Sequence, residues 1–235
     1  MYEAIVLAGG RGTRLQGVIK NVPKPMAPIG ETPFLEIVIK MLIQKGFGHI
    51  IFSVGYMADI IMRHFGTCFD EIQISYAVED IPLGTGGALR LAMQQSTMDH
   101  VFVFNGDTFL DLDVEQAEAD WQNYHIPIIV GRQVPDVSRY GALEESDGYI
   151  TKFLEKSENP QPGIVNAGCY IFPHSFLDDF PCNLPFSLEN DVIIPSVTNK
   201  PFKLFITDGI FIDIGVPKDY ERALKLLGAI KKYVG

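Results

Sequence analysis

The chain has 235 residues, of which 47% are hydrophobic and 20% charged, and its formal net charge is −10. This composition is sufficient for a packed core and excludes broad disorder. The acidic balance argues against nucleic-acid binding, because proteins that bind nucleic acids usually carry a basic patch or an overall excess of lysine and arginine. We therefore expect no nucleic-acid partner.

The three cysteines lie far apart in the chain, and no CxxC or HExxH pattern occurs. This pattern predicts neither a zinc site nor a disulfide framework. The first residues lack a basic segment followed by a long apolar run, and no apolar run approaches membrane-spanning length. We expect a cytoplasmic protein without a membrane partner, and a homo-oligomer remains open.

In the first 132 residues, short apolar runs typical of strands alternate with runs whose apolar residues recur at helical spacing. The expected strands span residues 2–8, 49–56, 71–77, 101–107 and 126–132, and the expected helices span residues 33–46, 58–66, 84–96 and 114–125. Alternation of this kind predicts a parallel sheet that is covered by helices on both faces.

After about Arg132 the pattern changes to shorter strands. The pair Asp147-Gly148 predicts a hairpin, and it is followed by an expected strand over 163–172, a short helical region over 185–197, two short strands within 203–215 and a closing helix over 217–233. The prediction is one α/β domain, residues 1–235, with a Rossmann-like doubly wound mixed sheet. Residues 1–132 form its nucleotide-binding half, and residues 133–235 form a small β-rich lobe for the second substrate.

The stretch "LAGGRGTRLQ", residues 7–16, directly follows the first expected strand. A dinucleotide loop reads GxGxxG with an acidic residue about twenty positions later, but the third glycine position is Leu15 here and no strand ending in an acidic residue follows. A Walker loop reads GxxxxGK[ST], and the chain contains no such sequence. The residues present therefore exclude both of these common phosphate-binding motifs.

The composition of this loop still favours a phosphate site. Gly9, Gly10 and Gly12 let backbone N–H groups approach a phosphate closely, and Arg14 adds a permanently charged fork that suits two phosphate oxygens. Lys24 lies between two prolines, which stiffen its backbone. These residues predict a cationic clamp on a polyphosphate; the alternative is a surface loop with solvated charges.

Two carboxylates follow apolar strands. Asp107 ends "VFVFNGD" and Asp213 ends a strand within "FIDIG". Ligands of open α/β sheets bind at the carboxyl ends of the strands, and two carboxylates there are suited to hold Mg²⁺ with waters and phosphate oxygens completing its shell. We therefore expect a magnesium site at Asp107 and Asp213, although a lone aspartate in such a place is more commonly a turn former.

The motifs "LAGGRGTRL", "PKPM", "LGTGGAL", "NGD", "FLEK", "VNAGCYIF" and "FIDIGVPKDY" together resemble, in their order, the sugar nucleotidyltransferases, also called sugar-1-phosphate pyrophosphorylases. The resemblance runs from Ile5 to about Tyr220 and implies a GT-A-like nucleotidyltransferase fold. Within the family, "VPKPMAPIGETPFLE", "SVGYMADIIMRHFG" and "SLENDVIIP" are most similar to enzymes that use GTP and D-glycero-α-D-manno-heptose 1-phosphate for bacterial surface polysaccharides.

The resemblance implies that a nucleoside triphosphate and a sugar 1-phosphate give a nucleoside diphosphate sugar and pyrophosphate. The implied catalytic residues are Arg14, which holds the β- and γ-phosphates, Lys24, which contacts the α-phosphate and the sugar's phosphate, and Asp107. Asp107 and Asp213 carry Mg²⁺, which screens the repulsion between the two phosphates. Gly17 departs from the family pattern, since many members have proline there.

The resemblance also implies the binding residues. For the sugar phosphate they are Gly141, Glu155, Lys156 and Asn166. For the nucleotide they are Leu7, Ala8, Gly9, Gly10, Gly12, Thr13, Glu79, Gly84 and Thr85. Glu79 bears on the base, because a carboxylate only accepts hydrogen bonds and guanine presents N1–H and N2–H₂ as a pair of donors. We therefore expect GTP.

Three alternatives remain open from the sequence. The first is the same chemistry with mannose 1-phosphate, or with UTP, dTTP or CTP. The second is a regulatory subunit that binds sugar nucleotides without catalysis, against which Arg14, Lys24, Asp107 and Asp213 argue. The third is a glycosyltransferase with a DxD metal motif at Asp111–Asp113, where we instead expect Asp113 to begin a helix as its N-cap.

Overall fold

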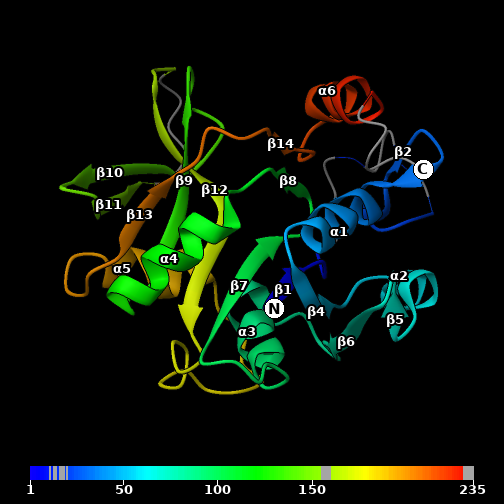
Figure 1. Cartoon of the computed structure of the whole chain (residues 1–235), viewed down its shortest axis with the longest axis horizontal. Helices are drawn as coiled ribbons and strands as arrows, with labels where there is room; N and C mark the ends of the chain where they lie inside the picture. Colours follow the sequence, from blue (N-terminus) through cyan, green and yellow to red (C-terminus); the bar gives the residue numbers. More distant parts are fainter. Residues whose placement is uncertain (11, 13–14, 16–18, 20, 155–159, 230–235) are drawn as a thin grey trace.

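The computed structural model describes residues 1–10, 12, 15, 19, 21–154 and 160–229. Within these residues, ten strands form one sheet in the order β10-β11-β13-β9-β12-β7-β1-β4-β6-β5 (Figure 1). The strands are β1 (Tyr2–Leu7), β4 (Phe47–Val54), β5 (Cys68–Phe69), β6 (Ile72–Val78), β7 (His100–Asn105), β9 (Ile128–Val134), β10 (Ala142–Ser146), β11 (Tyr149–Leu154), β12 (Gly163–Pro173) and β13 (Lys203–Ile206). Two small pairs accompany it, β2 (Pro28–Ile29) with β3 (Thr32–Pro33) and β8 (Thr108–Leu110) with β14 (Phe211–Asp213).

Residues 1–132 contain the expected parallel strands, except that the antiparallel β12 separates the fifth, β9, from the other four. Strands β7, β1, β4 and β6 are neighbours and run parallel, so that Leu7 lies in register with Ser53 on one side and Asn105 on the other. The carboxyl ends of these strands therefore meet at one edge. In an open α/β sheet this edge is where ligands bind.

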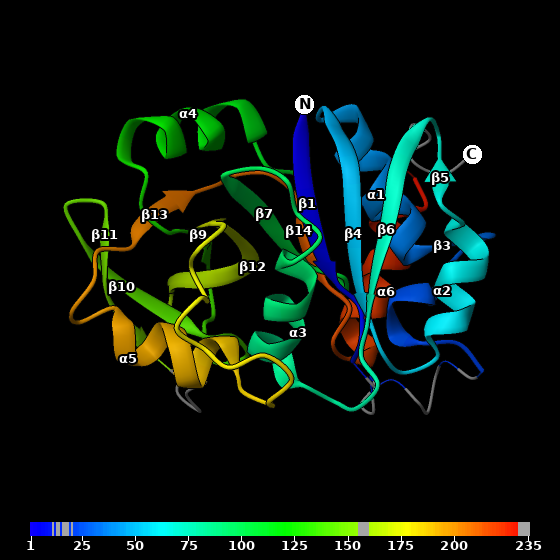
Figure 2. The same ribbon diagram turned by 90° about the horizontal axis from the view of Figure 1, so that it is seen from below.

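Both faces of the sheet are covered by helices, which are η2 (Lys24–Met26), α1 (Phe34–Gln44), α2 (Ala58–Phe65), α3 (Gly84–Met93), α4 (Val114–Tyr124), η3 (Leu188–Ile193), α5 (Ile194–Ser196) and α6 (Pro217–Leu227). Along β1, Ala4 and Val6 face a core shared with α1, α2, α4 and α6, whereas Ile5 faces a second core shared with α3 and η3. Figure 2 shows α3 and α5 on the side of the sheet opposite to α4. None of the described helices is long and apolar enough to cross a membrane.

The second half of the chain joins the same sheet through β12. This strand runs antiparallel to β7 on one side and to β9 on the other, which makes the sheet mixed, as expected. Strand β9 crosses the position at which we divided the sequence into halves, because it continues to Val134. The second half of the chain is thus an extension of the sheet formed by the first half.

Most of the expected elements are confirmed, with three differences, of which the first is that the closing helix expected over 217–233 ends at Leu227. The hairpin joins β10 to β11 with Asp147 and Gly148 both at positive φ, as its turn requires. The helical region expected over 185–197 is a π-helix, η3, followed by the single turn α5. The two strands expected within 203–215 belong to different sheets, since β13 extends the large sheet while β14 pairs with β8.

Candidate functional site

A cavity of about 1060 Å³ lies at the carboxyl edge of the parallel strands. It is lined from both halves of the chain. Its walls include every described residue that the sequence predicts to bind substrate or metal, namely Leu7, Ala8, Gly9, Gly10, Gly12, Lys24, Glu79, Gly84, Thr85, Asp107, Gly141, Asn166 and Asp213. The predicted residues Thr13, Arg14, Glu155 and Lys156, and also Gly17, lie outside the described residues.

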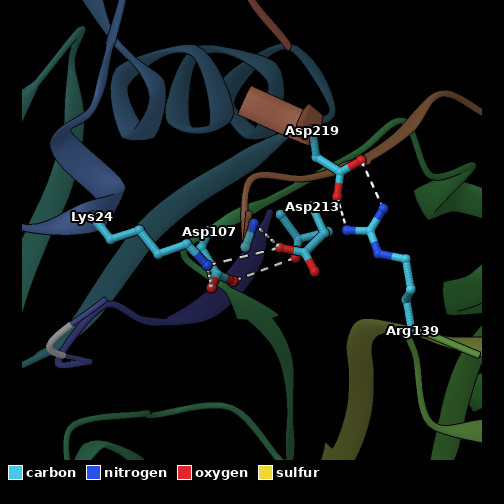
Figure 3. A network of polar contacts seen from close by, with 7 residues as sticks. Lys24, Asp107, Arg139, Asp213 and Asp219 are labelled. Atoms are coloured by element: carbon cyan, nitrogen blue, oxygen red, sulfur yellow. Dashed lines mark hydrogen bonds and ion pairs between the residues drawn. The ribbon is translucent and has the colours of Figure 1, made fainter. Parts of the chain in front are cut away.

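Lys24, Asp107 and Asp213 converge in this cavity (Figure 3). The ammonium of Lys24 forms an ion pair with Asp107 Oδ2 and lies 3.8 Å from Asp213 Oδ1. The two aspartates are brought together by the β8–β14 ladder, in which Asp213 pairs with Thr108 and the Ile214 N–H donates to the carbonyl of Asp107 at 3.0 Å. Asp107 and Asp213 follow Lys24 by 83 and 189 positions in the sequence, yet the three side chains form one cluster, as the sequence predicts.

The surroundings of Asp213 fit a cation. Burial and the neighbouring Asp107 carboxylate both raise the pKa of Asp213, while Lys24 and the backbone N–H of Gly215 partly oppose them. A divalent cation held by both carboxylates would relieve this repulsion, and hard oxygen donors are the ligands that Mg²⁺ prefers. In the described part of the chain, no three His, Cys, Asp or Glu side chains gather as a candidate metal site.

The glycines of the first loop allow two functional side chains to approach closely. Gly12 has φ +57°, and a Cβ at this position would lie 2.5 Å from Cβ of Lys24. A Cβ on Gly9 would lie 2.5 Å from Glu79 Oε1. A larger residue at either position would displace Lys24 or Glu79. The loop therefore packs against the lysine and the carboxylate in addition to offering backbone groups to the cavity.

Glu79 lies at the wall of the cavity and holds the loop that leads into α3. Its Oε2 accepts a hydrogen bond from the N–H of Leu83 at 2.8 Å, while Oε1 faces Gly9. Burial raises the pKa of Glu79, and the hydrogen bond from Leu83 partly opposes this effect. One carboxylate oxygen is thus fixed by the backbone, and the other accepts no hydrogen bond from the residues that the structure describes.

The sequence-based predictions did not include the ion pair between Arg139 and Asp219, which lies near the carboxylates of Asp107 and Asp213 (Figure 3). Arg139 lines the cavity, and its guanidinium donates to both oxygens of Asp219, with a distance of 3.1 Å for the Nη1–Oδ1 contact (Figure 3). Asp219 is buried in the first turn of α6. Its position in the sequence indicates only a favourable charge near the helix dipole. The partner, 80 residues away, cannot be recognised from that pattern.

The DxD alternative does not place its carboxylates in the cavity. Asp111 forms an ion pair with Lys45, at 2.7 Å between Nζ and Oδ1. Asp113 is the N-cap of α4, as expected, because its side chain accepts from the N–H of Gln116. Both aspartates therefore serve the packing of helices, and neither belongs to the described lining of the site.

Comparison with known proteins agrees with this arrangement. The family model described as nucleotidyl transferase matches residues 3–228. The D-glycero-alpha-D-manno-heptose 1-phosphate guanylyltransferase of Aneurinibacillus thermoaerophilus is 35% identical over 96% of this chain and 98% of its own length. The mannose-1-phosphate guanylyltransferase of Mycobacterium tuberculosis is 30% identical over 94% of this chain and 63% of its own length.

A solved structure is similar over the same extent. HddC from Yersinia pseudotuberculosis, which has also been crystallised in complex with GMP-PN, is 36% identical, with a TM-score of 0.86 over 97% of this chain and 100% of that chain. The fold, the convergent lysine and aspartates and the match over nearly the whole chain lead to one conclusion: the protein belongs to the nucleotidyl transferase family.

Proposed function

We propose that the protein transfers the guanylyl group of GTP to D-glycero-α-D-manno-heptose 1-phosphate, giving GDP-heptose and pyrophosphate for the synthesis of bacterial surface polysaccharides. The observation that carries the proposal is the convergence of Lys24, Asp107 and Asp213 in a cavity that both halves of the chain line. The similarity to heptose 1-phosphate guanylyltransferases over nearly the whole chain supports the choice of nucleotide and sugar.

In the proposed reaction, an oxygen of the sugar's phosphate attacks the α-phosphorus of GTP in line with the leaving group. A new P–O bond forms there, the bond between the α-phosphorus and the α–β bridging oxygen breaks, and pyrophosphate leaves with the electron pair. A phosphate monoester is already anionic, so the nucleophile needs no general base. Catalysis then consists of positioning two anions and stabilising the charge that develops.

Lys24 suits this task by position. Its side chain is largely buried beside the carboxylate pair, and its backbone is fixed between Pro23 and Pro25. Once it contacts the bound phosphates, its ammonium would stabilise developing negative charge without further reorganisation during the reaction. We propose that Lys24 contacts the α-phosphate and the incoming sugar phosphate. We also propose that Arg14 binds the departing pyrophosphate.

Asp107 and Asp213 would hold Mg²⁺ together with phosphate oxygens. The bound ion would reduce the repulsion between the two phosphates and polarise the α-phosphoryl group. In the structure Lys24 pairs with both carboxylates. We propose that the lysine turns toward the phosphates when a metal occupies the pair.

Glu79 supports guanine as the base. Its Oε1 faces Gly9 in the cavity, where it is suited to accept from N1–H or N2–H₂ of guanine. The second candidate function is mannose 1-phosphate guanylyltransfer, which the similarity to the mycobacterial enzyme favours. It uses the same cluster and differs only in the sugar.

A screen of substrate pairs tests the proposal. GTP, UTP, dTTP and CTP are each combined with heptose, mannose and glucose 1-phosphates in the presence of Mg²⁺, and pyrophosphate is measured. We expect release from GTP only when the acceptor has the manno configuration, with the highest kcat/KM for the heptose. Absence of pyrophosphate with every pair would contradict the enzymatic function, and a preference for a pyrimidine nucleotide would contradict the role of Glu79.

A further inference from the structure

The π-helix η3 presents a carboxylate, Glu189, to the cavity. π-helical turns are rare and occur frequently at functional sites. Two side chains fix the start of this helix: the Ser187 hydroxyl accepts from the N–H of Asn190 at 3.1 Å, and Asp191 accepts from the N–H of Ser187 at 2.7 Å. These bonds fix the start of the helix from which the Glu189 side chain extends.

Glu189 connects the two halves of the cavity through hydrogen bonds. Its Oε1 accepts from the hydroxyl of Tyr170 on β12 at 3.3 Å, and its Oε2 accepts from the hydroxyl of Thr85 at the start of α3 at 3.2 Å. Thr85 in turn accepts from the N–H of Leu188 at 2.9 Å. Because the hydroxyl of Thr85 is engaged on both sides, the nucleotide contact predicted for this residue would fall to its backbone N–H.

The hydrogen bonds run in a fixed direction from Asn166 to Glu189. The side-chain amide of Asn166 donates to the hydroxyl of Tyr170 at 2.6 Å, and this hydroxyl donates to Glu189. Burial, together with the neighbouring Glu189 carboxylate, raises the pKa of Tyr170 well above its ordinary value, so the phenol remains protonated. Asn166, which we expect to bind the sugar, is thus linked to Glu189 through a buried donor.

Glu189 keeps acceptor capacity toward the cavity. A carboxylate offers about four lone-pair sites, and three hydroxyl groups donate to this one, those of Tyr170 at 3.3 Å, Thr85 at 3.2 Å and Ser187 at 3.5 Å. All three bonds are longer than the usual O–H···O distance of about 2.7–2.8 Å. Within the described residues, no lysine, arginine or histidine pairs with this carboxylate. A carboxylate in this position fits a ligand with neighbouring hydroxyl groups, and such a ligand would supply shorter hydrogen bonds.

We propose that Glu189 determines sugar specificity by accepting hydrogen bonds from hydroxyl groups of the sugar 1-phosphate, and that Tyr170 and Thr85 hold it in position for this contact. The proposal rests on the proposed function, since it concerns the acceptor substrate of the same site. It adds a residue of η3 to the predicted sugar-binding residues. It also places the sugar between Asn166 on β12 and the helix that faces α3.

Steady-state kinetics of Glu189→Ala and Glu189→Gln provide the test, with Glu115→Ala as the matched control. Glu115 carries the same charge, is exposed on α4 and is not among the described residues that line the cavity. We expect Glu189→Ala to raise the KM for the sugar 1-phosphate about tenfold or more, with a smaller effect for Glu189→Gln and about twofold or less on the KM for GTP. Glu115→Ala should leave both values near those of the parent protein.

Deoxy analogues of the sugar 1-phosphate identify the contact. The analogue that lacks the accepted hydroxyl should bind the parent protein more weakly than the full sugar does. The Glu189→Ala variant should bind the analogue and the full sugar equally well, because the variant has already lost the same interaction. An unchanged KM for the sugar in Glu189→Ala would overturn the proposal. An effect confined to GTP, and lost with 2′-deoxy-GTP or 3′-deoxy-GTP, would overturn it by assigning Glu189 to the ribose.

Equilibrium binding separates this test from that of the proposed function. If the parent protein releases no pyrophosphate, the proposed function fails, and titration calorimetry of the sugar 1-phosphates with the parent protein and Glu189→Ala still decides the role of Glu189. A purely structural role predicts a lower melting temperature with equal affinities, which overturns the proposal. Weaker sugar binding at an unchanged melting temperature supports it.

Discussion

The guanidinium of Arg139 forms a two-bond ion pair with the buried carboxylate of Asp219. This pair ties the segment that carries Gly141, on the sugar side of the cavity, to the first turn of α6, which follows the loop of Asp213. The charge of Asp213 also contributes to raising the pKa of Arg139, after the dominant contribution of Asp219. The pair thus connects the predicted metal site with the predicted sugar site.

We expect Asp219→Asn to lower kcat/KM for the sugar 1-phosphate about tenfold and the free energy of unfolding by about 1–3 kcal/mol, because the variant weakens a charge-assisted pair with a buried partner. Arg139→Lys should lie between the parent and Asp219→Asn, since lysine keeps the charge but cannot form the two-bond geometry. Urea denaturation and steady-state kinetics measure both quantities. Unchanged values in Asp219→Asn would show that the pair does not position the site.

Removal of either member of the Lys24–Asp107 pair should reduce turnover strongly. We expect Lys24→Ala and Asp107→Asn each to lower kcat by about 10²–10³, the scale of other preorganised electrostatic groups. Lys40→Ala serves as the control for Lys24→Ala, because Lys40 pairs with Glu36 within α1, away from the described lining of the cavity. Rates within about threefold of the parent in Lys24→Ala would contradict our assignment of its role.

Recognition of the base by Glu79 is tested by a pair of nucleotides. Inosine triphosphate lacks the N2 amino group of GTP, so the parent protein should prefer GTP by about tenfold or more. Glu79→Gln should lose most of this preference because its amide presents a donor to the base as well as an acceptor. A preference for GTP that survives in Glu79→Gln would assign base recognition to other groups of the cavity.

The aspartates of the DxD pattern should be dispensable for turnover. Asp113→Ala removes the N-cap of α4 and should cost about 1 kcal/mol of stability, while Asp111→Asn weakens an ion pair with Lys45 and should cost less. Both variants should keep kcat within about twofold of the parent when assayed well below their melting temperatures. Loss of activity in Asp111→Asn without loss of stability would contradict this expectation and would indicate that the DxD motif binds a metal.

Glu3 predicts how stability depends on pH. Burial by itself would raise the pKa of Glu3, but hydrogen bonds from Ser96, His49 and Thr97 outweigh it and lower the pKa from 4.5 to about 2. Because the folded pKa lies below the unfolded one, this stabilisation is complete above about pH 4.5 and is lost as the pH falls toward about 2. Glu3→Gln should therefore be less stable than the parent near neutral pH, by about 1–3 kcal/mol.

Urea denaturation of the parent and of Glu3→Gln over this pH range measures the difference. The gap between the two proteins should narrow steadily below about pH 4.5. A gap that stays constant down to about pH 2 would show that the carboxylate of Glu3 is not preferentially ionised in the folded state.

The sequence predicts the parts of the site that follow directly from strand ends. Asp107 is identifiable because it follows an apolar strand of the parallel sheet. Lys24 and Asp213 are identifiable from their stiff or apolar flanking residues, but they reach the same place from η2 and from the separate β8–β14 pair. The position of β12 between β7 and β9 is not predictable in this way, since hydrophobic alternation reveals strands but not their neighbours. This pairing is what brings Asn166 to the nucleotide half.

Two features of the site depend on contacts that no local pattern reveals. The pairing of Arg139 with Asp219 spans 80 residues, and each residue alone is consistent with a solvated charge. The π-helix that carries Glu189 has the same apolar spacing as an ordinary short helix, so the sequence predicts helix but not the wider turn. The ion pair joins two distant segments of the second half, whereas the π-helix packs against α3 of the first half.

Isotope labelling tests the central claim most directly. Heptose 1-phosphate that carries ¹⁸O in the non-bridging oxygens of its phosphate is incubated with GTP, Mg²⁺ and the protein, and the products are analysed by mass spectrometry. Attack of the sugar's phosphate on the α-phosphorus of GTP predicts GDP-heptose that retains all of the label and pyrophosphate that carries none. Label in the pyrophosphate, or no GDP-heptose at all, would contradict guanylyl transfer.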